Sequence, residues 1–413
     1  MENLSVTLVG VEQRALGFVT TPPRLVEFMT ELAAPIKTRC RVLEPACGDA
    51  PFLSAFAARY GTHHELVGID INPAAIQAAK KRVPFADFIE GDFLLWQPNE
   101  PFDIIIGNPP YGIIGDASHY SIHVLKDRKE AYKLRFRTWR GKFNIYGAFI
   151  EHAVNLLKPG GKLVFVVPAS WLVLDDFAKL RAFLSVSGSL HVYYLGKVFQ
   201  GRNVSCVVLV LEKGSKGLRL YDGQTLAVEK PVYQGELIRF ETPELLSFEQ
   251  SGIPLGSLFE VHFAARSPEI RRHPQTSIKP CDGYVPVLTG RNLKAGWIDY
   301  EHCYSGLWFP KDAAPTLRFF YAFPHIVVGH TKGTKVVAAL DERCYPWREE
   351  FHLVPKVSRL DLPAIVKHLN SDPIQKYVQQ LYRDFVPHLT TPMLVRVPIP
   401  QFVVGDSQVG RLL

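Results

Sequence analysis

Several features that would define other classes of protein are missing from this chain of 413 residues. No apolar run is long enough to cross a bilayer, so we expect no transmembrane segment and no membrane partner. The start of the chain, residues 1–4, lacks the basic and apolar parts of a secretory signal. No C-x-x-C pair occurs among the cysteines, which argues against a zinc site or a disulfide framework. These absences favour a cytoplasmic protein that holds no metal. The six cysteines are Cys40, Cys47, Cys206, Cys281, Cys303 and Cys344.

Acidic residues are outnumbered by basic ones, 40 Asp and Glu against 47 Lys and Arg, and the excess positive charge is concentrated in one segment. The formal net charge is +7, which favours an anionic partner. Residues 126–142 hold eight Lys or Arg against two acids, with Tyr132, Phe136 and Trp139 between them. A mixture of basic and aromatic residues is typical of nucleic-acid binding, although a solvated helix face can have the same composition. We expect this segment to contact an anionic polymer.

The first 240 residues alternate short apolar runs with helical patterns, which indicates βαβ units and a mostly parallel sheet. The last two expected strands have no long helix between them, so we expect them to form a hairpin at one edge. A Thr-Thr-Pro-Pro run at 20–23 predicts a capped helix through residue 33, and Pro159 and Gly160 predict the end of a helix over 148–157. The expected strands are 41–43, 66–69, 88–90, 102–106, 163–167, 192–195 and 206–211.

Beyond residue 240 the pattern changes to short strands, loops rich in Pro and Gly, and aromatic clusters such as 307–309 and 345–347. This change predicts a second domain of mixed structure. We place the boundary between 241 and 250, and divide the chain into domains 1–243 and 244–413.

A loop of small residues follows the first expected strand, at 44–50 (EPACGDA). Ligands of open α/β sheets bind at the carboxyl ends of strands, and Ala46 and Gly48 let a ligand approach the backbone. The loop has neither a G-x-G-x-x-G pattern nor a phosphate-binding lysine, so a dinucleotide is not expected. Asp70 ends the second strand and Asp92 follows the third, where one acid suits a ribose diol and the other an adenine amine.

The tetrapeptide at 108–111 (NPPY) follows the fourth expected strand. Two consecutive prolines stiffen the loop, so it can hold hydrogen-bond acceptors at a fixed angle. Asn108 Oδ1 and the Pro109 carbonyl suit the hydrogens of an exocyclic amine, whose lone pair is otherwise delocalised into the ring. Tyr111 then suits stacking on an extruded base. Without its context, the tetrapeptide would also fit a proline turn with an Asn cap.

Together these motifs resemble class I S-adenosylmethionine-dependent methyltransferases and, among them, the TaqI-type adenine-N6 DNA methyltransferases of the gamma class. The resemblance covers nearly the whole chain. It implies a Rossmann-like, mostly parallel seven-stranded sheet with a C-terminal mixed target-recognition domain, S-adenosyl-L-methionine as cofactor, and double-stranded DNA as partner. It also implies methylation of TCGA within a restriction-modification system, whose endonuclease acts on the same site without a stable complex. The matching segments are 20–23, 44–48, 91–93, 108–111 and 383–388.

The resemblance also implies roles for individual residues. Asp70 binds the cofactor's ribose, Asp92 its adenine amine, and Phe93 packs on its adenine ring. Phe199 stacks on the flipped adenine and joins Asn108, Pro109 and Tyr111 as the catalytic set. The usual last glycine of the first motif is replaced by Ala50. The other implied cofactor-binding residues are Thr21, Glu44, Ala46, Ile71, Pro110 and Phe149.

Five residues are predicted to contact DNA. Arg266 and Arg291 offer donors suited to base edges, whereas Lys332 and Lys142 suit phosphates. Pro387 matches a family position that fills the space left by the flipped base. Any one of them, taken alone, would also be an ordinary surface residue.

Two other classes of function stay open. Similar Asn-Pro-Pro-Tyr loops occur in N-methyltransferases that act on RNA or on protein amides, although the large second domain favours duplex DNA. Cytosine-N4 enzymes usually have Ser in place of Asn108, and we find no Pro-Cys nucleophile of a cytosine-C5 enzyme in this loop. A DNA-binding specificity protein without catalysis would lack some of these motifs, which here are complete.

Overall fold

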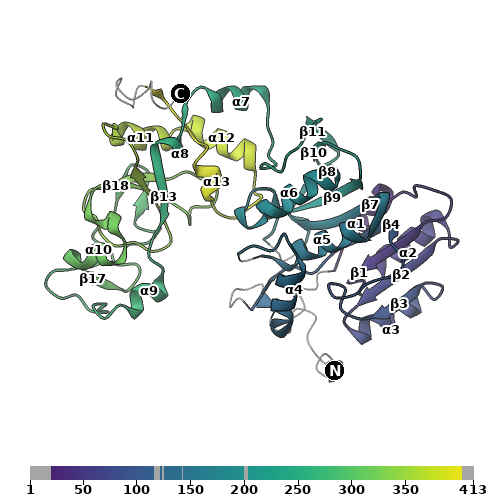
Figure 1. Ribbon diagram of the computed structural model, residues 1–413. Helices are drawn as coiled ribbons and strands as arrows, with labels where there is room; N and C mark the ends of the chain where they lie inside the picture. The colour runs from purple at the N-terminus through teal and green to yellow at the C-terminus, as the bar shows by residue number, and fades with distance from the viewer. Residues whose placement is uncertain (1–19, 116–120, 123–124, 142, 200–202, 402–413) are drawn as a thin grey trace. The chain divides into compact units, whose positions relative to one another are not determined.

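The structure is a computed structural model, and the chain divides into two compact units, Met1–Arg239 and Phe240–Leu413 (Figure 1). The division falls a few residues before the sequence-based boundary. Within the described residues, we find no helix with the length and apolar character that a membrane span requires. The residues that the structure describes are 20–115, 121–122, 125–141, 143–199 and 203–401.

The first unit is built on one sheet, which has nine strands among the described residues, in the order β11-β10-β8-β9-β7-β4-β1-β2-β3. Strands β7, β4, β1, β2 and β3 pair in parallel, and β9 runs antiparallel to both of its neighbours. This confirms the predicted class I methyltransferase sheet. The strands are β1 (Arg41–Pro45), β2 (Glu65–Asp70), β3 (Asp87–Glu90), β4 (Phe102–Gly107), β7 (Leu157–Pro168), β8 (Gly188–Gly196), β9 (Cys206–Lys213), β10 (Leu218–Asp222) and β11 (Thr225–Lys230).

The sheet extends two strands further than predicted. Strands β8 and β9 are antiparallel, as expected, but they are not at the edge because β10 pairs with β8 and β11 with β10. In β11 only Val228 is buried, and Leu226 and Val228 alone form an apolar alternation too short to predict a strand. Pairing with an already formed strand decides its conformation instead.

Six α-helices of the described part belong to this unit, and Figure 1 labels them. The predicted threonine cap of the first is wrong, because Pro22 is the N-cap and makes no side-chain cap hydrogen bond. Helix α5 ends one residue before the predicted end, and β7 begins at the next residue, with Gly160 in the left-handed region at φ +73°. The helices are α1 (Pro23–Leu32), α2 (Pro51–Tyr60), α3 (Pro73–Arg82), α4 (Lys129–Arg135), α5 (Ile145–Leu156) and α6 (Ala178–Ser187).

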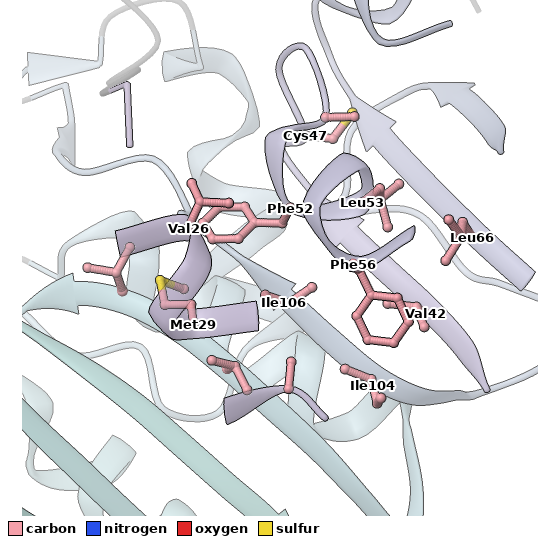
Figure 2. Close-up of a cluster of buried hydrophobic side chains, with 14 of the residues drawn as sticks. Val26, Met29, Val42, Cys47, Phe52, Leu53, Phe56, Leu66, Ile104 and Ile106 are labelled. Carbon is pink, nitrogen blue, oxygen red and sulfur yellow. The ribbon is translucent and has the colours of Figure 1, made fainter. Parts of the chain in front are cut away.

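Alternate strand residues bury opposite faces of the sheet. Ile104 and Ile106 of β4 belong to the cluster that α1 and α2 cover, where Phe52 and Phe56 pack over them (Figure 2). Ile105 is equally buried but lies outside that cluster, as the two-residue period of a strand requires. Each such side chain contributes about 1.5–3 kcal/mol by leaving water. This burial on both faces fixes the carboxyl ends of the parallel strands, where the site is built.

The second unit has a mixed structure, as predicted. Its largest sheet is antiparallel, with the order β13-β20-β18-β19 in the described residues. Its core contains the fully buried Trp347 together with Phe309 and Phe320. The strands of this sheet are β13 (Phe259–Phe263), β18 (His325–Val328), β19 (Ala338–Asp341) and β20 (Phe351–Pro355), and short pairs join β12 (Ile253–Pro254) to β21 (Pro398–Ile399), β14 (Tyr284–Pro286) to β17 (Trp308–Pro310), and β15 (Leu293–Lys294) to β16 (Trp297–Ile298). The α-helices are α7 (Pro243–Gln250), α8 (Leu255–Leu258), α9 (Ser267–Arg272), α10 (Ala314–Leu317), α11 (Leu362–Leu369), α12 (Asp372–Tyr382) and α13 (Thr391–Leu394).

Candidate functional site

A cavity of about 810 Å³ lies at the carboxyl ends of β1, β2 and β4 in the first unit. Every residue predicted to bind the cofactor lines it. The predicted catalytic residue Asn108 lines the cavity as well. The structure therefore gathers at one site residues that lie far apart in the sequence. The predicted cofactor residues that line it are Thr21, Glu44, Ala46, Asp70, Ile71, Asp92, Phe93, Pro110 and Phe149.

The loop after β1 owes its shape to three residues in the left-handed region. Ala46, Gly48 and Ala50 have φ of +49°, +55° and +58°. Asp70 holds the loop, because its Oδ2 accepts a hydrogen bond from Gly48 N at 2.8 Å. Ala50 keeps the conformation that a glycine would adopt freely, at a cost of about 1–2 kcal/mol for an L-residue. The missing glycine of the motif therefore leaves the turn intact.

Glu44 and Asp70 are buried acids in the wall of the cavity. Glu44 is 2% exposed and accepts hydrogen bonds from Leu53 N at 2.8 Å and Phe52 N at 3.4 Å, in the first turn of α2. Burial raises the pKa of Glu44 to about 8 and also raises the pKa of Asp70 above its ordinary value. A ligand with positive charge would stabilise both carboxylates in their ionised form. The acids and the small residues of the loop therefore fit S-adenosylmethionine, which carries a sulfonium, an ammonium and a ribose diol.

Asp92 also lines the cavity and is held by three donors. Its Oδ1 accepts from Leu94 N at 3.0 Å, and its Oδ2 accepts from Arg128 Nη1 and Tyr132 Oη, both at 2.7 Å. Sequence reasoning missed Arg128 and Tyr132, which belong to the basic segment predicted to face DNA. Charged residues are spread along this segment, and their order does not indicate which of its side chains point into the protein.

The aromatic residues of that segment pack within the first unit. Tyr132 and Phe136 are buried, and Trp139 packs in turn against Tyr132, with ring centroids 6.4 Å apart. Lys129 is also used internally, since its Nζ donates to Ile114 O at 2.7 Å. Lys142 lies outside the described residues. The exposed cations of the segment include Lys126, Arg137 and Arg140, whereas Lys133, also exposed, pairs with Glu130 at 2.7 Å.

Aromatic rings form a further part of the cavity wall. Phe93 and Phe149 lie with their centroids 5.0 Å apart and their planes 35° apart, and His152 packs edge-on against Phe93. Burial lowers the pKa of His152 to about 4, so its ring is neutral at pH 7. This wall is therefore apolar and uncharged, which suits the flat face of an adenine ring.

The loop at 108–111 leaves β4 beside the cavity. Asn108 Nδ2 donates to Thr21 Oγ1 at 3.1 Å, and Tyr111 Oη donates to Val166 O at 3.0 Å. The buried Phe199 packs edge-on to Tyr111, with centroids 6.1 Å apart. Pro109, also buried, completes the loop. Of the four predicted catalytic residues, only Asn108 lines the cofactor cavity.

A further residue braces this loop. Asn144 Oδ1 accepts from Gly112 N at 2.9 Å, and Ile145 N donates to Gly112 O at 2.9 Å. Asn144 is the N-cap of α5 but makes no side-chain cap hydrogen bond, because it uses its oxygen on the loop. An Asn before a helix predicts a cap, so the sequence gave no sign of this contact.

In the second unit, four segments meet, each carrying one of the residues predicted to contact DNA. Ala264 N donates to Glu350 O at 2.9 Å, and Leu389 N donates to Gly333 O at 3.0 Å. A Cβ placed on Gly290 would lie 2.5 Å from Glu350 Oε1, so the backbone there passes directly over this side chain. We call the four segments together the recognition surface. They are 264–266 with Arg266, 289–292 with Arg291, 330–333 with Lys332, and 387–389 with Pro387.

Known proteins resemble both units. Residues 84–199 match the family described as Eco57I restriction-modification methylase, residues 43–108 a methyltransferase domain, and residues 285–399 a TaqI-like C-terminal specificity domain. The chain is 59% identical over 394 residues to the type II methyltransferase M.TthHB8I of Thermus thermophilus, an alignment covering 93% of this chain and 91% of that one. It is 30% identical over 203 residues to M.HincII of Haemophilus influenzae, covering 48% and 38%.

Among solved structures, a likeness to the type IIG restriction endonuclease BpuSI extends over 99% of this chain and 62% of that one, with 13% identity and a TM-score of 0.49.

The parallel sheet and the acid-lined cavity at its carboxyl edge define a class I S-adenosylmethionine-dependent methyltransferase. With its near full-length relative and its specificity domain, the chain belongs to the type II DNA methyltransferases of restriction-modification systems.

Proposed function

We propose that this methyltransferase acts on N6 of an adenine that is flipped out of duplex DNA. One observation carries the proposal: Asn108, at the end of β4, lines the cofactor cavity while its amide is held by Thr21. The hydrogen bond from Nδ2 sets the orientation of the amide, and its carbonyl oxygen Oδ1 is the kind of group that accepts from a substrate amine. An asparagine at this position suits adenine, because cytosine-N4 enzymes usually have serine there.

The chemistry requires positioning more than a strong base. Bound S-adenosylmethionine supplies a methyl group on a sulfonium, which is already electrophilic. Asn108 Oδ1 and the Pro109 carbonyl accept hydrogen bonds from the two amine hydrogens, which favours a pyramidal nitrogen with its lone pair directed at the methyl group. As the C–N bond forms, the bond between sulfur and the methyl carbon would break and S-adenosylhomocysteine would leave. The proton would then pass from the nitrogen to water, so the loop needs no ionisable base.

Stacking residues hold the base in the site. Tyr111 and Phe199 lie edge-on to each other beside the catalytic loop, and either ring face offers part of the stacking energy that a flipped base loses. Tyr111 is fixed through its hydroxyl by Val166 O. Unpaired adenine would then be held between these rings and the acceptors at 108 and 109.

The resemblance to TaqI-type enzymes favours TCGA as the target, with a cognate endonuclease that cleaves the unmethylated site. The contacts proposed for DNA are those of Arg266, Arg291 and Lys332, with Pro387 filling the space of the flipped base and Lys142 at the backbone. We infer from the same relationship that the enzyme works in the cytoplasm, where the DNA is.

Transfer of a tritiated methyl group tests the substrate class. Wild-type enzyme should label duplexes that contain TCGA and leave matched duplexes without it, structured RNA and total protein unlabelled. The Asn108→Ala variant should transfer nothing while it shifts the same duplex on a gel at a similar concentration. Label confined to RNA or protein, or wild-type turnover by Asn108→Ala, would overturn the proposal.

A further inference from the structure

Glu350 is a fully buried acid directly beneath the recognition surface. Its Oε2 accepts a hydrogen bond from His330 N, and its Oε1 accepts from Thr331 Oγ1 at 2.8 Å. Its backbone oxygen accepts from Ala264 N at 2.9 Å. One residue therefore fixes two of the four segments, one with its side chain and the other with its backbone.

The third segment lies directly against the same side chain. A Cβ placed on Gly290 would clash with Thr331 Oγ1 and would lie 2.5 Å from Glu350 Oε1. Only a residue without a side chain allows the backbone to pass here. Arg291, which follows Gly290, is thereby placed relative to the carboxylate.

His330 connects the fourth segment. Its backbone donates to Glu350, its Nδ1 lies 3.1 Å from Leu389 O, and its ring packs on His388 with centroids 5.0 Å apart. The same ring packs edge-on to Phe263 at 5.1 Å, one residue before the first segment. A displacement of His330 would therefore also move the segments that carry Arg266 and Pro387.

We propose that Glu350 is a positioning residue for target specificity: it holds all four segments of the recognition surface in register without touching DNA. The inference rests on the specificity domain of the family and on the proposed DNA contacts of Arg266, Arg291 and Lys332. Burial alone would give Glu350 a role in the stability of the unit and not in specificity. The acid sets which sequence is read, whereas phosphate contacts set how tightly any DNA is bound.

A physical difference between the two kinds of contact separates these effects. Bidentate contacts to base edges need donors placed within about 0.5 Å, whereas contacts to phosphates tolerate displacement because charge attraction falls slowly with distance. Loosening the four segments should therefore weaken discrimination between sequences more than it weakens overall DNA affinity.

The test compares methyl transfer, as kcat/KM, on the preferred duplex of the wild type and on duplexes with one altered base pair. Glu350→Ala should lower the ratio of these values by at least about tenfold, with cofactor affinity and non-specific duplex binding within about twofold of wild type. Glu350→Gln should keep most of the ratio, since its oxygen can accept from His330 N while its amide donates to Thr331 Oγ1. Gly290→Ala should lower the ratio by displacing Thr331.

Asp341→Ala is the matched control. Asp341 is a fully buried acid of the same unit that accepts from Tyr300 Oη at 2.8 Å and Trp347 Nε1 at 2.7 Å. It should lower the melting temperature as much as Glu350→Ala does and leave the ratio unchanged. A folded Glu350→Ala protein with the wild-type ratio, or an equal loss of ratio in Asp341→Ala, would overturn the inference. The comparison uses the site that the wild type prefers, so a target other than adenine in TCGA would refute the proposed function alone.

Discussion

Asn108 and Thr21 are 87 positions apart in the sequence, yet Asn108 Nδ2 donates to Thr21 Oγ1 across 3.1 Å. Thr21 lies just before α1 and Asn108 lies just after β4, so the bond joins two separate elements in the lining of the cavity. It fixes the rotation of the Asn108 amide and hence the direction of its oxygen. The hydroxyl at residue 21 thus controls the acceptor on which the proposed chemistry depends.

Thr21→Val should therefore slow catalysis without loss of structure. A hydrogen bond of this kind contributes about 0.5–1.5 kcal/mol, so kcat should fall by up to about tenfold, while Thr21→Ser should stay close to wild type. Single-turnover methyl transfer at saturating cofactor and DNA measures the effect. Equal rates for the Val and Ser variants would show that the hydroxyl has no part in orienting the amide.

Asn144→Ala should also slow the chemical step. The substitution removes the acceptor for Gly112 N and frees the end of the catalytic loop, so kcat should fall severalfold while KM for DNA changes little. Asn370→Ala is its control, since Asn370 makes comparable hydrogen bonds to the backbone of Ala338 in the second unit. If Asn144→Ala and Asn370→Ala lose the same fraction of kcat at an equal loss of stability, Asn144 has no specific role in positioning the catalytic loop.

Tyr132→Phe should weaken cofactor binding. It removes one of the donors that orient Asp92 and leaves the ring packing in place, so the dissociation constant of S-adenosylmethionine should rise by about three- to tenfold. Titration calorimetry without DNA measures it. Tyr233→Phe, a buried tyrosine of the same unit whose hydroxyl donates to Glu236 O, should bind the cofactor as wild type does. An unchanged affinity of Tyr132→Phe for S-adenosylmethionine would show that the Tyr132 hydroxyl has no part in cofactor binding.

Glu44 should make the apoprotein less stable as the pH rises. Burial raises its pKa from 4.5 to about 8, so between these values the folded protein holds a proton that the unfolded chain has lost. The free energy of unfolding then falls by up to about 1.4 kcal/mol per pH unit in this window. Denaturant unfolding at pH 5.5 and 8.5 should show a smaller fall in Glu44→Gln than in wild type.

Glu350 adds to the same slope, since burial raises its pKa to about 7. Glu44→Gln should therefore reduce the pH dependence without abolishing it. A fall identical to that of the wild type would mean that Glu44 is already ionised in the folded protein.

The sequence was sufficient to predict the sheet and the cavity because both depend on local signals. Apolar runs such as 102–106 become buried parallel strands, and the residues that end them, such as Asp70 and Asn108, must lie at one edge of the sheet. The position of a residue along a strand therefore placed it at the site.

Contacts that depend on side-chain direction could not be predicted in this way. Arg128 and Tyr132 belong to a segment with charges on every face, so nothing in their order indicates that they turn toward Asp92. Glu350 follows no motif, and its role appears only when His330 and Gly290 are brought around it. Strand β11 likewise forms through its partner rather than through its own pattern.

Analysis of the methylated nucleoside tests the central claim most directly. Duplex DNA containing TCGA would be methylated by the wild-type enzyme, digested to nucleosides and separated by liquid chromatography with mass detection. The account predicts N6-methyl-2′-deoxyadenosine as the sole product, absent when Asn108→Ala replaces the wild type. N4-methyl-2′-deoxycytidine, or 5-methyl-2′-deoxycytidine, would contradict it.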